Sequence, residues 1–133
     1  KEMKEIIIGS SAEATTIVNS TNTAITAGSG TLPVLGTPFM IALMEKATCN
    51  AVFDFLEEDE TTVGTGVNIS HSKASGIGTV ISAKAVVAEC SGRKIVFDVS
   101  AADSSGDIIG KGTIERFVVK ENKFMEKVGT NEI

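Results

Sequence analysis

The stretch that decides the fold is residues 37–56, which read Thr37-Pro38-Phe39-Met40-Ile41-Ala42-Leu43-Met44-Glu45-Lys46-Ala47-Thr48-Cys49-Asn50-Ala51-Val52-Phe53-Asp54-Phe55-Leu56. Thr37 suits a helix N-cap, and Pro38 fits the first helical position, where the missing N–H of proline costs nothing. At 3.6 residues per turn the polar residues gather on one stripe, made of Lys46, Asn50, Asp54 and Glu57. The segment is predicted to be one long helix that ends near Leu56, because the acidic residues that follow are unfavourable at a helix C-terminus.

Glu45 lies off this polar stripe. Its neighbours one turn away along the helix are Ile41, Ala42, Thr48 and Cys49. A carboxylate among mostly apolar residues needs a partner, a raised pKa or a catalytic role. Glu45 is therefore the first candidate for function, and the alternative is a structural ion pair with Lys46 or Lys84.

The composition indicates a single domain over residues 1–133, because a chain of this length with 42% hydrophobic residues can form a complete core. A net charge of −5 and the lack of a Lys/Arg run argue against nucleic acid as the main partner. The longest apolar stretch is the predicted helix, which charged residues interrupt, so it is expected in the core and not in a membrane. The charged start of the chain has no signal-peptide core, and a cytoplasmic location is expected.

The sequence offers few groups that could hold a cofactor. It has two cysteines, Cys49 and Cys90, and one histidine, His71. Two widely separated cysteines in apolar or strand-like surroundings are expected to be buried free thiols. No metal site is expected, because a single histidine without a cysteine cluster cannot complete one. The glycine-containing segments 64–66 and 76–78 are too short for phosphate-binding loops, so no cofactor is predicted.

The rest of the chain has the β-branched content and two-residue period of strands. Strands are predicted over 6–8, 13–18, 61–71, 79–90, 94–102 and 108–120, with a loop over 21–31 and a helical turn over 122–128. Tight turns separate the last three strands, which are predicted to form an antiparallel meander. Gly110 and Gly112 share one face of the last strand, where they permit a close backbone approach. Together these elements indicate an α+β fold in which an antiparallel sheet wraps around one helix.

Three polar residues could act together in catalysis: Thr37, Glu45 and His71. A hydroxyl, a carboxylate and an imidazole are the groups needed for nucleophilic or general-base acyl transfer. Sequence spacing does not bring His71 to the other two. The alternative assigns them structural roles, with Thr37 a simple cap and His71 a hydrogen-bonded strand residue.

Two stretches resemble a known family. They are Leu35-Gly36-Thr37-Pro38-Phe39-Met40-Ile41-Ala42-Leu43-Met44-Glu45-Lys46-Ala47 and Val63-Gly64-Thr65-Gly66-Val67-Asn68-Ile69-Ser70-His71. Both are similar to the hot-dog-fold thioesterases of the fluoroacetyl-CoA thioesterase type. The likeness extends from about Thr31 to Val128 and includes Gly112-Thr113-Ile114-Glu115-Arg116 and Lys123-Phe124.

This resemblance implies a hot-dog fold, hydrolysis of an acyl-CoA thioester, and a homodimer or a dimer of dimers with its active site near the dimer interface. It implies catalytic roles for Thr37, Glu45 and His71, and a part for Gly64 in the thioester site. The residues themselves suggest that Lys73, Lys84, Arg93 or Arg116 could meet the CoA phosphates, but the favoured interpretation of each is a solvated surface charge.

One departure from the family concerns the segment before the threonine. The fluoroacetyl enzyme carries aromatic residues there, whereas this chain has Gly30-Thr31-Leu32-Pro33-Val34-Leu35. We therefore expect a generic small acyl group in a pocket lined by Leu32, Val34 and Leu35, beneath a mobile loop at residues 28–30. The alternatives are a hot-dog protein that binds acyl-CoA without hydrolysis, a hydratase, and a small β-rich carrier of an apolar ligand.

Overall fold

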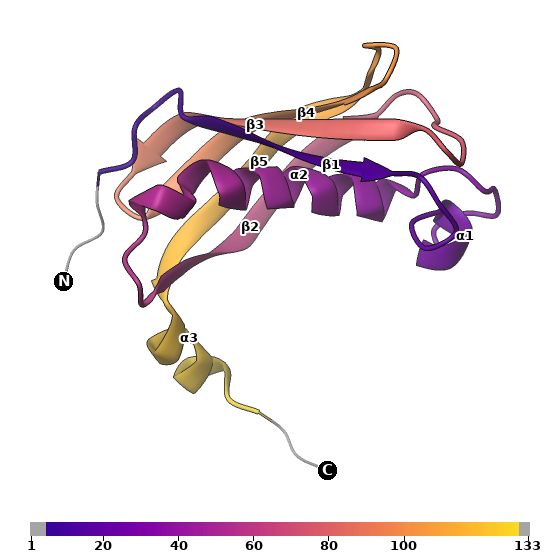
Figure 1. Cartoon of the computed structure of the whole chain (residues 1–133). Helices are drawn as coiled ribbons and strands as arrows, with labels where there is room; N and C mark the ends of the chain where they lie inside the picture. The colour runs from indigo at the N-terminus through magenta and orange to yellow at the C-terminus, as the bar shows by residue number, and fades with distance from the viewer. Residues whose placement is uncertain (1–4, 131–133) are drawn as a thin grey trace.

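A curved antiparallel sheet and a central helix make up most of the computed structural model, which describes residues 5–130 (Figure 1). The five strands are β1 (Ser11–Ile17), β2 (Glu60–His71), β3 (Val80–Ser91), β4 (Lys94–Asp103) and β5 (Ile108–Lys120). Their order across the sheet is β1-β3-β4-β5-β2, and every pair is antiparallel. The predicted meander of β3, β4 and β5 is confirmed, and so is the α+β class.

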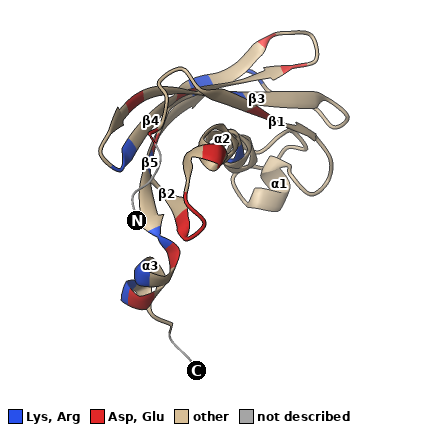
Figure 2. Ribbon diagram, turned by 60° about the vertical axis from the view of Figure 1, so that its left-hand side comes forward, with Lys and Arg blue, Asp and Glu red and all other residues tan. Residues whose placement is uncertain are grey.

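The long helix α2 (Thr37–Val52) lies along the inner face of the sheet, and Figure 2 shows the sheet curving around it. A 3₁₀ turn, Phe53–Phe55, follows the helix, so the predicted end near Leu56 is confirmed. The N-cap is Gly36 and not Thr37, which is already helical. The prediction was wrong by one residue because Thr37 directs its hydroxyl to His71 instead of capping the helix.

Alternate residues of the strands fill the core between the sheet and α2. Ala83 and Ala85 of β3 and Phe97 of β4 are fully buried, as are Met40 and Met44 of the helix. The alanines let the helix approach the sheet closely, while burial of each large apolar side chain contributes about 1.5–3 kcal/mol of stability. The alternation seen in the sequence therefore corresponds to the inner and outer faces of the sheet.

The two glycines of β5 permit close contacts, as predicted. A Cβ added to Gly110 would lie 2.7 Å from Sδ of Met40, and one added to Gly112 would overlap the carbonyl oxygen of Asn68. Gly110 thus lets a methionine of α2 rest directly on the strand. His71 pairs with Gly110 in the β2–β5 ladder, so this contact also sets the depth of the helix beside the candidate site.

Two predictions at the start of the chain were wrong. Residues 6–8 are not a strand, because Gly9 adopts a φ of +92° and turns the chain just before β1. The predicted loop over 21–31 contains one helical turn, α1 (Ala24–Ala27). Thr23 caps this turn and Gly28 ends it with a φ of +71°. Four residues are too few to show a helical period in the sequence.

Other expectations concern the C-terminus and the cysteines. The predicted helical turn is confirmed as α3 (Glu121–Val128). Both cysteines are free, but Cys49 is exposed, contrary to the prediction, because it lies on the side of α2 that the sheet does not cover. Cys90 is partly buried, which raises the pKa of its thiol.

Within residues 5–130, no helix is long and apolar enough to cross a membrane.

Candidate active site

Thr37 and His71 form a direct hydrogen bond. Thr37 is the first residue of α2 and His71 is the last residue of β2, and the fold brings these two ends together across 34 positions of sequence. The Thr37 hydroxyl oxygen lies 2.7 Å from Nδ1 of His71. A hydroxyl that donates to an imidazole nitrogen is the arrangement in which the imidazole can accept its proton.

The other ring nitrogen of His71, Nε2, is buried and lacks a hydrogen-bond partner within residues 5–130. A buried polar atom without a partner is costly, and such atoms mark places where a ligand, a water or another chain completes the structure. If the Thr37 hydroxyl donates to Nδ1, the ring proton resides on Nε2, which then presents a donor.

A small pocket of about 260 Å³ opens beside this pair. Its lining includes Thr37, His71, Val34 and Leu35. Leu32, the third residue predicted to line an acyl pocket, is 63% exposed and lies outside this lining. The N-terminus of α2 has no side-chain cap, and its first residue, Thr37, lines this pocket, so the positive end of the helix dipole lies beside it. A hydroxyl bonded to an imidazole beside a helix N-terminus is an arrangement that suits attack on a carbonyl, whose oxygen then becomes negative.

Glu45 belongs to a second cluster. Nη1 of Arg116 donates to Oε2 of Glu45 at 3.2 Å. Arg116 is buried and also donates from Nε to the Thr62 hydroxyl at 2.8 Å and from Nη2 to the Thr62 carbonyl at 3.0 Å. The partner of Glu45 is therefore Arg116 and neither Lys46 nor Lys84. The view of Arg116 as a surface charge is wrong, because its side chain points inward from β5.

Gly64 completes this second cluster. A Cβ at this position would lie 2.9 Å from Oε2 of Glu45 and 3.5 Å from Nη1 of Arg116. The ladder between β2 and β5 shifts register just after Gly64, with Thr65 as the extra residue of a bulge. The carboxylate of Glu45 therefore rests against bare backbone, which only glycine provides at this position.

The two clusters are separated within one chain. Eight residues divide Thr37 from Glu45, which is about 12 Å along a helix that rises 1.5 Å per residue. Seven residues divide Gly64 from His71, which is about 23 Å along a strand. The structure thus brings Thr37 to His71 and Glu45 to Gly64, but it does not unite the two pairs within one chain.

Sequence reasoning named Arg116 only as a possible phosphate contact and missed its role as the partner of Glu45. Its signal was present in the alternation of β5, where Ile114 and Val118 face inward and Arg116 shares their face. An arginine on the buried face of a strand needs a carboxylate partner. Combining this pattern with the misplaced carboxylate on the helix would have paired Arg116 with Glu45.

Comparison with known proteins identifies the family. The model of the fluoroacetyl-CoA-specific thioesterase family matches residues 18–122, which is most of the chain. The chain belongs to this family. The fluoroacetyl-CoA thioesterase of Streptantibioticus cattleyicolor is 38% identical over 95 residues, which cover 71% of this chain and 68% of that protein. The expected class of thioester hydrolase is thereby confirmed.

Solved structures agree with this assignment. A structure of the fluoroacetyl-CoA thioesterase superposes with a TM-score of 0.88 at 30% identity, covering 94% of this chain and 96% of that one. A Thermus thermophilus thioesterase superfamily member gives a TM-score of 0.87 at 27% identity, covering 95% and 93%. A hot-dog-like protein from Thermanaerovibrio acidaminovorans, 21% identical with a TM-score of 0.79 over 93% and 94%, shares the fold. The predicted hot-dog fold is confirmed.

Proposed function

We propose that this member of the thioesterase family hydrolyses small acyl-CoA thioesters with Thr37, Glu45 and His71 as its catalytic residues. The observation that carries the proposal is the 2.7 Å hydrogen bond between the Thr37 hydroxyl and Nδ1 of His71 at the N-terminus of α2. A related enzyme, the fluoroacetyl-CoA-specific thioesterase, has been solved in a complex with fluoroacetate and CoA, which supports a CoA ester as substrate.

His71 drives the first step by accepting a proton at Nδ1. The proton comes either from the Thr37 hydroxyl, which then attacks the thioester carbonyl, or from a water that Thr37 orients. The dipole of the α2 N-terminus stabilises the negative carbonyl oxygen. The C–S bond then breaks and the CoA thiolate, a good leaving group, departs without a strong acid. If Thr37 is the nucleophile, a water hydrolyses the resulting acyl-threonine ester and frees the hydroxyl. Glu45 serves as a further base or as the nucleophile, with Arg116 fixing one of its oxygens.

The active unit is a homodimer in which Glu45 of one protomer meets Thr37 and His71 of the other. Three features support this arrangement: the separation of the two clusters in one chain, the unpartnered Nε2 of His71, and the surface around Glu45. On that surface Ile41, Glu45, Cys49 and Phe53 follow one another at four-residue intervals, and Phe53 is 73% exposed. The adjacent strand β2 is at the edge of the sheet, so it is free to join a second sheet.

The acyl group is small and need not be fluorinated. Val34 and Leu35 supply an aliphatic wall to a pocket of about 260 Å³, and residues 30–35 contain no aromatic side chain. Nothing in this segment replaces the aromatic lid expected of the fluoroacetyl enzyme. A short linear or branched acyl-CoA is therefore the proposed substrate class.

The test is release of free thiol from a panel of short, branched and aromatic acyl-CoAs. We expect turnover of short acyl esters by the wild-type chain, and loss of that turnover in His71→Ala and Thr37→Ala. Binding of acyl-CoA without thiol release would overturn the proposal and indicate a sensor. Addition of water to an enoyl-CoA without thiol release would indicate a hydratase.

A further inference from the structure

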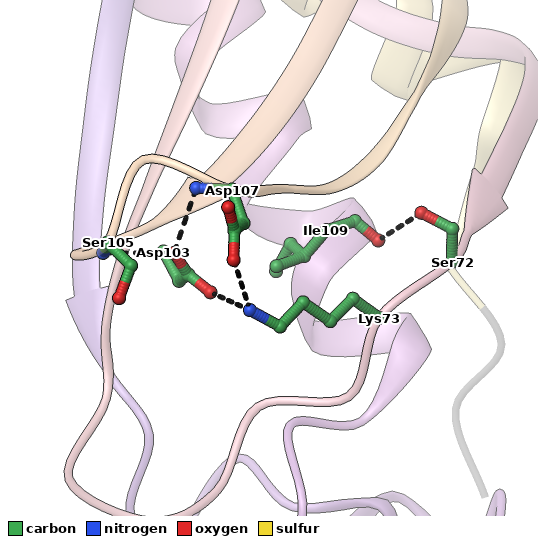
Figure 3. A network of polar contacts seen from close by, with 6 residues as sticks. All are labelled: Ser72, Lys73, Asp103, Ser105, Asp107 and Ile109. Atoms are coloured by element: carbon green, nitrogen blue, oxygen red, sulfur yellow. Dashed lines mark hydrogen bonds and ion pairs between the residues drawn. The ribbon is translucent and has the colours of Figure 1, made fainter.

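The segment that follows His71 is held on both sides. Directly after β2 the carbonyl oxygen of Ile109 accepts hydrogen bonds from the Ser72 N–H at 2.7 Å and from the Lys73 N–H at 3.3 Å. The Ser72 hydroxyl donates to the same carbonyl at 3.3 Å, as Figure 3 shows. These contacts continue the attachment of the chain to β5 beyond the end of the regular ladder.

Lys73 then ties this segment to the turn between β4 and β5. Its Nζ lies 2.8 Å from Oδ2 of Asp103 and 2.6 Å from Oδ2 of Asp107, and Figure 3 shows the ammonium between the two carboxylates. Asp103 is itself fixed, because its Oδ1 accepts the N–H groups of Ser105 and Asp107, each at 3.0 Å. Lys73 therefore binds to a turn that is already ordered by its own hydrogen bonds.

The same segment also holds the residues that lead into Thr37. The Leu35 N–H donates to the carbonyl of Ser75 at 2.8 Å, and Val34 forms a bridge with Gly76. Only Gly36 lies between Leu35 and Thr37. The backbone of Gly36 is tightly packed, because a Cβ added there would lie 3.0 Å from the Thr23 carbonyl oxygen. Residues 72–76 thus form a strap that has His71 at one end and the approach to Thr37 at the other.

We propose that Lys73, held by Asp103 and Asp107, is a positioning residue that fixes the strap and thereby the hydrogen bond between Thr37 and His71. This inference rests on the proposed function, since it gives Lys73 a role only if that pair acts in turnover. Lys73 lines the small pocket beside the pair, but its ammonium is occupied by the two carboxylates. It acts through His71 and Thr37 and does not bind the CoA phosphates.

The charge states suit a permanent clamp. The hydrogen bond to Asp103, followed by that to Asp107, raises the pKa of the Lys73 ammonium above its ordinary range. The hydrogen bond from Lys73 holds the pKa of Asp103 below its ordinary value. The Lys73–Asp103 pair weakens only when the pH falls through the lowered pKa of Asp103 or rises through the raised pKa of Lys73. The clamp is therefore complete at neutral pH.

The test compares Lys73→Met, Lys73→Arg and Asp107→Asn with the wild-type chain in steady-state hydrolysis. We expect Lys73→Met to lower kcat on the order of 10-fold to 10²-fold, because a small misplacement of a catalytic pair is enough for such a loss. KM should change little, and Lys73→Arg should restore most of kcat by keeping the charge. The double variant Lys73→Met/Asp107→Asn should lose no more than Lys73→Met alone, since the contact that Asp107→Asn removes is already lost when Lys73 is replaced.

Two controls distinguish a positioning role of Lys73 from a general effect of losing an ion pair and from a loss of stability. Lys120 forms an ion pair of the same kind with Asp59, with Nζ 3.2 Å from Oδ2, at the other end of the β2–β5 ladder. Lys120→Met breaks this pair and should leave kcat unchanged. Thermal unfolding of Lys73→Met should stay near that of the wild type, because the Lys73 side chain is 46% exposed and the Asp103 carboxylate, which is 8% exposed, keeps the hydrogen bonds from the Ser105 and Asp107 N–H groups. A higher KM with unchanged kcat would show a substrate contact and overturn the proposal. If Lys73→Met keeps the wild-type kcat while His71→Ala is inactive, the positioning role of Lys73 is refuted and the proposed function stands. If His71→Ala is active, the proposed function itself is refuted.

Discussion

At the scale of single residues, the shape of Glu45 can be kept while its basicity is removed. Glu45→Gln preserves the side-chain length and can still accept a hydrogen bond from Arg116, which donates to Oε2 at 3.2 Å. It removes the charge and the ability to accept a proton. We predict a loss of kcat on the order of 10²-fold or more, measured as thiol release from a short acyl-CoA. Turnover at the wild-type rate would remove Glu45 from the catalytic set and leave it as a structural partner of Arg116.

Gly64 allows a second test at this scale with a matched control on the same strand. Gly64→Ala places a methyl group 2.9 Å from Oε2 of Glu45, whereas Gly66→Ala meets only the Cβ of Glu115 at 3.6 Å, an ordinary contact. We predict that Gly64→Ala displaces the carboxylate and lowers kcat by about 10²-fold, while Gly66→Ala keeps it. Neither φ is positive, so each alanine should change the free energy of unfolding by no more than about 1 kcal/mol. Equal kcat values for the two variants would contradict the role of Gly64.

At the scale of elements, the contact between α2 and β5 depends on Gly110. An alanine there would place its Cβ 2.7 Å from Sδ of Met40 and 2.8 Å from the carbonyl oxygen of Ser70, so the helix or the strand must shift. We predict that Gly110→Ala lowers the free energy of unfolding by about 1–3 kcal/mol, the usual cost of overpacking a core. Urea denaturation measures this loss, with Gly76→Ala as the control because its Cβ would meet nothing within 4 Å. Wild-type stability of Gly110→Ala would mean that the Met40 side chain can adopt another conformation without cost.

We propose that the segment before α2 sets the acyl selectivity. A pocket walled by Val34 and Leu35 distinguishes neighbouring acyl chains only by their length, which is worth about 1–3 kcal/mol per methylene. We therefore predict modest differences in kcat/KM between acetyl- and propionyl-CoA and no preference for fluoroacetyl-CoA over acetyl-CoA. A competition assay with the two C2 esters is the measurement. Strong selection of the fluorinated ester would show that residues 28–35 recognise fluorine without an aromatic lid.

Elements with a regular period could be predicted from the sequence, whereas contacts set by the tertiary fold could not. The four strands after α2 were placed within about two residues, and so was the helix when the 3₁₀ turn that follows it is included, which is the usual precision of such boundaries. The N-cap was misplaced because the partner of Thr37 is His71, 34 residues away, and local pattern contains no such information. The pairing of Glu45 with Arg116 across 71 positions was missed because the inward-facing position of Arg116 on β5 was not combined with the off-stripe carboxylate on the helix. The short turn α1 was missed because its cap and its terminal glycine act over only a few residues.

At the scale of the whole molecule, the separation of Thr37 and His71 from Glu45 means that the proposed active site requires two chains. If two chains join through the α2 face and the β2 edge, each site takes Glu45 from one protomer and the Thr37–His71 pair from the other. An isologous dimer then contains two such sites, because its two-fold axis relates them. Light scattering at micromolar concentration should therefore give the mass of a dimer, and a monomer would contradict the proposed assembly.

Mixing two inactive variants tests whether the site is shared. In a heterodimer of Glu45→Gln and His71→Ala chains, one shared site has both changes and the other has neither. After denaturation and joint refolding in equal amounts, half of the dimers are mixed, so about a quarter of the wild-type activity should return. If each site lies within one protomer, every site in the mixture carries one lesion and no activity returns. Glu45→Gln mixed with Gly64→Ala is the control that should stay inactive in both cases. Glu45 and Gly64 lie in contact within one chain, so one protomer supplies both residues to the same site. Each site of the mixed dimer therefore carries one of the two substitutions.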